Sequence, residues 1–176
     1  LLLTGHNLNN GLAKLYRNDG QGSFTDLSLD LPLVSGGVAR WGDYDNDGRL
    51  DFVLTGSTWN GGSQTSIYRN LGTGAFVNIG ASITGGGAAV WGDYDNDGDL
   101  DLLLAEIPSS WYAVVGSKVY RNDGNGEFTD ITAALPELQH GDISWADTDN
   151  DRDLDLFLSG GGISRIYRNG IATVNT

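Results

Sequence analysis

The stretch "WGDYDNDGDLDLLL" (residues 91–104) decides the fold, because it recurs twice without gaps. Its counterparts are "WGDYDNDGRLDFVL" (41–54) and "WADTDNDRDLDLFL" (145–158). A second phrase, Tyr-Arg-Asn, recurs out of phase with the first at 16–18, 68–70, 120–122 and 167–169. Equivalent tryptophans, Trp41, Trp91 and Trp145, are 50 and then 54 positions apart. The repeating unit is therefore about fifty residues long, which is the length of one β-propeller blade.

Each unit predicts four short strands. The first strand covers 38–44 or 88–94, the second covers 50–56 or 100–106, the third carries Tyr-Arg-Asn, and the fourth covers 75–80 or 127–132. Asn-Gly and Asp-Gly turns suit the hairpin between the third and fourth strands. Glycines crowd ahead of the first strand (Gly36, Gly37, Gly85, Gly86 and Gly87), as expected where blades converge and only small residues fit.

These strands predict an all-β fold, a β-propeller of four-stranded blades of about fifty residues, with about three and a half blades present. The 176 residues form one propeller segment, with blades at approximately 1–36 (partial), 37–84, 85–140 and 141–176 (partial). One tryptophan and one phenylalanine recur in each unit and are predicted to fill the core between blades: Trp41, Trp91, Trp145, Phe24, Phe76 and Phe128.

The two outer units are incomplete. "LLLTG" at Leu1 aligns with the second strand of the other units, and the chain ends shortly after the last Tyr-Arg-Asn. The four units are therefore predicted to contain three, four, four and three strands, in chain order. Open ends expose strand edges and apolar faces, so we expect completion by a longer chain or by a homo-oligomer, and favour the longer chain.

Aspartates alternate in the pattern D-x-D-x-D-G-x-x-D. Hard oxygen ligands at alternate positions of a tight loop suit Ca²⁺, with a backbone carbonyl expected from the seventh position, whose side chain stays unused. About three Ca²⁺ sites are predicted. Their residues are Asp43, Asp45, Asp47, Arg49 and Asp51; Asp93, Asp95, Asp97, Asp99 and Asp101; and Asp147, Asp149, Asp151, Asp153 and Asp155.

Other interpretations of the loops are weaker. An EF-hand needs an acidic twelfth residue, but Leu54, Leu104 and Leu158 stand there. Mg²⁺ demands stricter octahedral geometry, and zinc would call for His or Cys. A merely solvated acidic turn does not explain three copies of mutually repelling carboxylates. Arg152 replaces the glycine of the third loop, so that site should be the weakest.

The combined motif, "WGDYDNDGDLDLLL" followed by "YRNDGNGEFTD" (120–130), resembles the FG-GAP/VCBS repeat of integrin α-subunit propellers and of many secreted microbial proteins. The resemblance covers nearly the whole chain. It implies a β-propeller with calcium in the loops between first and second strands, ligated by the twelve aspartates of the D-x-D-x-D-G-x-x-D pattern. It also implies an extracellular or cell-surface module for adhesion or interaction, in some members with sugars.

The overall charge and composition argue against some classes of binding partner. A formal charge of −13 argues against nucleic acid and anionic membranes. No apolar run approaches a membrane span of roughly 18–20 residues, so no membrane insertion is expected. The chain has no cysteine, so disulfides do not hold it together.

Recognition is expected on the loops between second and third strands, which vary among units. Aromatic and amide residues stand there, and they suit binding to a glycan or to a protein partner. The alternative, that these side chains pack onto the tops of the blades, is equally consistent with the sequence. These candidates are Trp59, Asn60, Trp111, Tyr112 and His6. No separate catalytic constellation is visible, so a non-enzymatic binding module is predicted. The alternatives are an accessory or scaffold propeller of a secreted polysaccharide-active enzyme and a purely structural assembly subunit.

Overall fold

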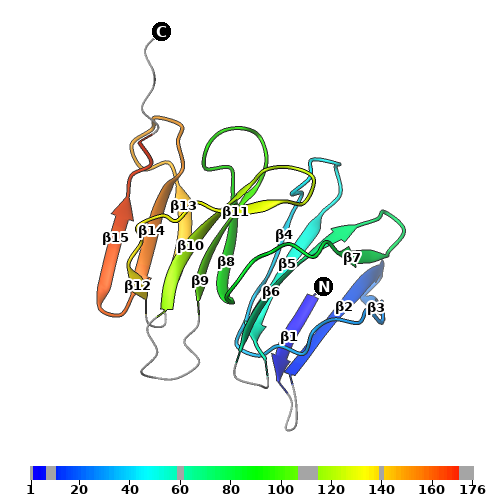
Figure 1. Ribbon diagram of the computed structural model, residues 1–176. Helices are drawn as coiled ribbons and strands as arrows, with labels where there is room; N and C mark the ends of the chain where they lie inside the picture. Colours follow the sequence, from blue (N-terminus) through cyan, green and yellow to red (C-terminus); the bar gives the residue numbers. More distant parts are fainter. Residues whose placement is uncertain (1, 7–10, 59–61, 107–114, 139–140, 171–176) are drawn as a thin grey trace.

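The computed structural model describes residues 2–6, 11–58, 62–106, 115–138 and 141–170. These residues form four small antiparallel sheets that stand side by side in chain order (Figure 1). The all-β class is confirmed, and the arrangement is that of an open, propeller-like array. No helix in the described ranges is long and apolar enough to cross a membrane.

The strands follow the predicted composition of three, four, four and three. The first sheet contains β1 (Leu2–His6), β2 (Gly11–Gly20) and β3 (Ser23–Asp26), and the second contains β4 (Ala39–Gly42), β5 (Asp51–Ser57), β6 (Ser63–Asn70) and β7 (Phe76–Asn78). The third contains β8 (Gly87–Gly92), β9 (Asp101–Glu106), β10 (Val115–Asn122) and β11 (Phe128–Asp130), and the fourth contains β13 (Asp142–Ala146), β14 (Asp155–Gly160) and β15 (Ile163–Tyr167). A short strand, β12 (Glu137–Leu138), also pairs with β10 and was not predicted. The approximate blade boundaries stay a prediction.

Within each sheet, successive strands pair as a simple meander. The registers repeat: Val53 of β5 lies opposite Ile67 of β6, and Leu2 of β1 lies opposite Leu15 of β2. The match places β1 in the second strand position of its sheet, as the alignment of "LLLTG" predicts.

The first strands of neighbouring sheets lie next to one another, β4 beside β8 and β8 beside β13. Close approach explains the glycines ahead of them. A Cβ on Gly37 would lie 1.8 Å from the carbonyl oxygen of Thr55, and one on Gly86 would lie 2.6 Å from that of Gln64. No side chain fits at such distances. Gly86 approaches the preceding sheet, as predicted for a position where sheets converge, whereas Gly37 approaches β5 of its own sheet.

The core lies between the sheets as three separate apolar clusters. In the central cluster, Val53 and Ile67 of the second sheet pack against Leu102 and Leu104 of the third, and all four are essentially unexposed. Each sheet thus buries its face against the next, which is how the blades of a propeller hold together.

The prediction that the repeated aromatics fill the core is confirmed for Phe128, which is buried. It is wrong for Phe24 and Trp41, which are 49% and 41% exposed. Phe24 lies on β3 of the first sheet, the outermost described sheet on that side, and Trp41 lines an open groove between the first and second sheets.

The connections between strands gather at the two ends of the sheets. The connections after β4 and β8, and the hairpin turns after β6 and β10, lie at one end of the sheets (Figure 1). The connections that leave β5 and β9 depart from the opposite end (Figure 1).

Candidate metal centre

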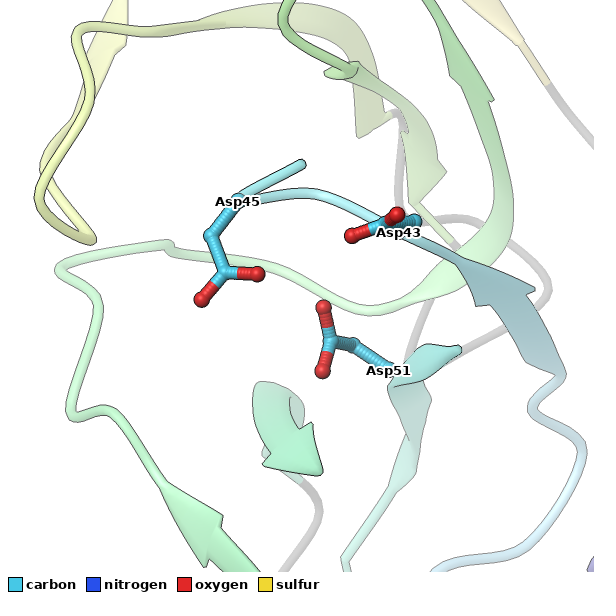
Figure 2. A group of neighbouring side chains, drawn as sticks. All are labelled: Asp43, Asp45 and Asp51. Carbon is cyan, nitrogen blue, oxygen red and sulfur yellow. The ribbon is translucent and has the colours of Figure 1, made fainter. Parts of the chain in front are cut away.

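The loop between β4 and β5 gathers three carboxylates, from Asp43, Asp45 and Asp51 (Figure 2). One oxygen of each lies within 4.8 Å of the others. The loop between β8 and β9 repeats this arrangement with Asp93, Asp95 and Asp101. Both groups consist only of carboxylates, a hard oxygen donor set.

The first aspartate of each loop holds the turn in shape. Asp43 accepts hydrogen bonds from the backbone nitrogens of Asp47 at 3.0 Å and Gly48 at 2.9 Å. The turn needs a left-handed residue at its sixth position, where Gly48 has φ of 83°. Asp93 makes the same pair of bonds in the second loop, to Asp97 at 3.1 Å and Gly98 at 3.0 Å.

The last aspartate ties the loop to the third strand. Asp101 is 0% exposed and accepts hydrogen bonds from the backbone nitrogens of Tyr94 at 3.0 Å and Asn122 at 2.8 Å. Burial raises the pKa of its carboxyl to about 6, although the two backbone donors oppose the shift. Asp51 is held by the equivalent bonds, and burial likewise raises its pKa.

The aspartates at the third position of the first two loops, Asp45 and Asp95, give the strongest indication that a cation binds there. Oδ1 of Asp45 and Oδ1 of Asp95 are buried and have no hydrogen-bond partner within the described ranges. Burial, and then the charge of Asp97, raises the pKa of Asp95. A buried carboxylate oxygen without a partner is costly, and a bound cation would satisfy it. The residues present therefore fit a divalent, oxygen-preferring metal ion in these two loops.

The third loop is built differently. Its grouped carboxylates are Asp147, Asp149 and Asp151, all exposed, and Asp155 lies outside the group. Asp155 keeps the hydrogen bond from the backbone nitrogen of Asn169, which is equivalent to those from Asn70 and Asn122 in the other loops. It also accepts a hydrogen bond from the hydroxyl of Thr148, and this contact lowers its pKa. Arg152 has φ of 78°, the left-handed conformation that Gly48 and Gly98 take in the other two loops.

The fifth-position aspartates of the first two loops, Asp47 and Asp97, lie outside the grouped carboxylates. Asp47 pairs with the guanidinium groups of Arg49 and Arg69. Arg69, from the Tyr-Arg-Asn phrase, also lies with Nε 2.6 Å from Oδ2 of Asp45. Arg69 thus balances part of the carboxylate charge of the first loop.

The side chains at the seventh position lie outside the grouped carboxylates and make hydrogen bonds of their own. Asp99 accepts a hydrogen bond from the side-chain amide of Asn46 at 2.7 Å, and Asp153 accepts one from Asn96 at 2.8 Å. Arg49 donates through Nε to the carbonyl of Asn70 at 2.8 Å. The sequence signal that sequence reasoning missed is the asparagine at the fourth position of all three loops.

Of the five residues predicted to bind a ligand, His6 alone belongs to the described residues. His6 ends β1, at the end of the sheets opposite the aspartate loops, and its side chain lies outside the described set. Trp59, Asn60, Trp111 and Tyr112 lie outside the described residues.

Four repeated sheets with acidic loops at one end define the class of propeller-type repeat proteins. The family model of the FG-GAP-like repeat matches residues 1–54 and 43–104, which together cover more than half of the chain. The chain belongs to this family. No curated protein and no solved structure matches it.

Proposed function

We propose that the chain is a calcium-binding, non-catalytic interaction module that works outside the cell. The observation that carries the calcium assignment is the pair of buried, unpartnered oxygens of Asp45 and Asp95, each within a three-carboxylate group. Oxygen-only donors in a compact, irregular loop favour Ca²⁺ over Zn²⁺ and Mg²⁺.

When bound, the ion would neutralise carboxylates that otherwise repel one another beside the interface between sheets. Asp51 and Asp101 would each join the ion to the third strand of their sheet, through backbone bonds from Asn70 and Asn122. Calcium would thereby hold the loop, the second strand and the third strand together. Its expected contribution is structural, leaving the opposite end of the sheets for recognition.

The proposed partner is a protein or a glycan bound through the loops at that opposite end. Support comes from the sequence, which varies there while the scaffold repeats, and which places Trp59 and Trp111 in two of these loops. Trp59→Ala and Trp111→Ala should abolish capture on a glycan array or in a pull-down and leave the melting temperature unchanged. A partner retained by both variants would place recognition elsewhere.

Calcium is tested by thermal unfolding and isothermal titration calorimetry. A ligand that binds only the folded state stabilises it by about 2.7 kcal/mol per site at a hundredfold excess over Kd. EDTA should lower the melting temperature, and Ca²⁺ should restore it better than Mg²⁺ does. Asp45→Asn should remove one site from the titration, whereas Asp30→Asn, which removes an exposed charge elsewhere, should leave the stoichiometry intact. An unchanged melt in EDTA, with no heat on adding Ca²⁺, contradicts the proposal.

A further inference from the structure

The arginine of the Tyr-Arg-Asn phrase has one kind of partner in the first and third sheets and another in the second and fourth. Arg17 pairs with Asp19, with Nε and Oδ1 2.6 Å apart, and Arg121 pairs with Asp123, with Nη2 and Oδ1 2.6 Å apart. In both sheets the partner stands two positions after the arginine. Within the described ranges, Arg121 forms no ion pair with the carboxylates of its own aspartate loop.

The second sheet lacks this acidic partner. Leu71 stands two positions after Arg69, and a leucine cannot pair with a guanidinium. Arg69 instead reaches the first aspartate loop, where its Nε lies 2.6 Å from Oδ2 of Asp45. Its Nη2 also lies 3.4 Å from Oδ2 of Asp47. The arginine therefore contacts a member of the three-carboxylate group of that loop.

The fourth sheet has the arrangement of the second. Gly170 stands two positions after Arg168, and Nη1 of Arg168 lies 3.2 Å from Oδ2 of Asp149. Asp149 holds the third position of its loop, as Asp45 does in the first loop. An aspartate two positions after the arginine thus keeps the guanidinium to itself, whereas a leucine or a glycine leaves it to the aspartate loop.

A threonine on the neighbouring strand holds the acidic partner in place. The hydroxyl of Thr25 donates to Asp19, and that of Thr129 donates to Asp123. Each threonine lies opposite the arginine in the strand register, and in the second sheet Val77 occupies this position. Both the carboxylate and the hydroxyl that would hold the arginine are therefore replaced by apolar side chains in the second sheet.

Arg69 satisfies Asp45 only in part. The Nε of Arg69 is buried and has no hydrogen-bond partner within the described ranges, so its contact with Asp45 is an ion pair without hydrogen-bond geometry. The other carboxylate oxygen of Asp45, Oδ1, has no partner either. Arg69 also lines a cavity of about 470 Å³ together with Asn78 and Asn125. The guanidinium thus has room to move away from the carboxylate.

We propose that Arg69 competes with Ca²⁺ for the carboxylates of the first loop, and that Asp123 removes the equivalent competition from the second loop. The inference rests on the proposed calcium binding and adds an order of affinity, in which the second loop binds Ca²⁺ more tightly than the first. A guanidinium beside one oxygen of a carboxylate repels a cation on the other oxygen. Binding at the first loop therefore works against the charge of Arg69 or displaces it.

The first experiment follows the amide signals of Gly48 and Gly98 in the ¹⁵N-labelled chain, with free Ca²⁺ set by a chelator buffer. Each amide donates to the first aspartate of its own loop, so the two signals report the two loops separately. Arg69→Gln should lower the Ca²⁺ concentration at the Gly48 midpoint by about fivefold and leave the Gly98 midpoint unchanged. The matched control, Arg121→Gln, removes the same charge from the equivalent position and should move the Gly98 midpoint by about twofold at most.

The second experiment changes the partner instead of the arginine. Leu71→Asp should draw Arg69 away from Asp45 and tighten the first loop about as much as Arg69→Gln does. The same substitution in the Arg69→Gln background should have little further effect, which separates a relocated arginine from an added negative charge. Conversely, Asp123→Leu should weaken the second loop only while Arg121 is present.

The outcomes separate this inference from the proposed function. If neither glycine signal responds to Ca²⁺ in the parent chain, calcium binding is refuted and the competition falls with it. If both signals respond but Arg69→Gln leaves the Gly48 midpoint unchanged, only the competition is refuted. A parent chain in which Gly48 titrates at lower Ca²⁺ than Gly98 would also overturn the inference, as would equal gains from Leu71→Asp with and without Arg69.

Discussion

Asn46 in the first aspartate loop donates its side-chain amide to the carboxylate of Asp99 in the second loop, with Nδ2 and Oδ1 2.7 Å apart. The same amide reaches the carbonyl of Gly98 at 3.0 Å. Asn96 repeats the contact with Asp153 at 2.8 Å. Successive aspartate loops are therefore latched to one another, so the acidic end of the molecule behaves as one connected structure.

Removing the hydrogen bond between Asn46 and Asp99 should lower the free energy of unfolding. Asn46→Gly keeps the left-handed backbone (φ of 55°) and removes the amide, so we expect a loss of about 1 kcal/mol in the free energy of unfolding. Chemical denaturation in Ca²⁺ measures it. Asn125→Gly is the control, because Asn125 has φ of 54° in a hairpin turn and, within the described ranges, its side chain has no such hydrogen bond to another sheet. Equal effects of the two substitutions would show that the latch contributes nothing.

The glycine beneath each tryptophan should tolerate no side chain. In Gly92→Ala, the new Cβ would lie 2.5 Å from Trp145, so the fourth sheet must shift or lose packing. Such overpacking costs typically 1–3 kcal/mol, and the melting temperature should fall accordingly. Gly116→Ala, also in a strand but with no atom within 4 Å of the new Cβ, should have little effect. A melt of Gly92→Ala that overlays the parent would contradict the packing.

Arg152 stores backbone strain that glycine would relieve. Its φ of 78° is close to that of Gly48 and Gly98, at 83° and 95°. Arg152→Gly should raise the free energy of unfolding by about 1 kcal/mol and strengthen Ca²⁺ binding at the third loop. Arg152→Ala separates the two causes, because it removes the charge and keeps the strained conformation. If Ala and Gly act alike in denaturation, backbone strain is not the cause.

The hydroxyl of Tyr120 anchors the segment that connects the second and third sheets. It lies 3.2 Å from the backbone nitrogen and 3.1 Å from the hydroxyl oxygen of Thr84. Tyr120→Phe removes the hydroxyl that pairs with the backbone nitrogen and carbonyl of Thr84, and it should lower the free energy of unfolding by about 1–2 kcal/mol. Tyr167→Phe, at the equivalent phrase of the fourth sheet, should change it by less than half as much. Hydrogen exchange at Thr84 should accelerate only in the Tyr120 variant.

The repeated spacing by itself determined the strands, the turns and the composition of each sheet. Alternating apolar residues and Asn/Asp-Gly turns act over a few residues, so their consequences are readable from the chain. The same holds for the aspartate loop, where Asp43 bonds Asp47 and Gly48 within five positions. The conformation of Arg152 was predictable for this reason.

Only the tertiary structure decided which residues meet across the sheets. Asn122 reaches the carbonyl of Tyr44 across 78 positions, and Asn46 reaches Asp99 across 53. These contacts are set by the rotation and separation of neighbouring sheets, which the packing of Trp91 on Gly42 fixes and no local pattern encodes.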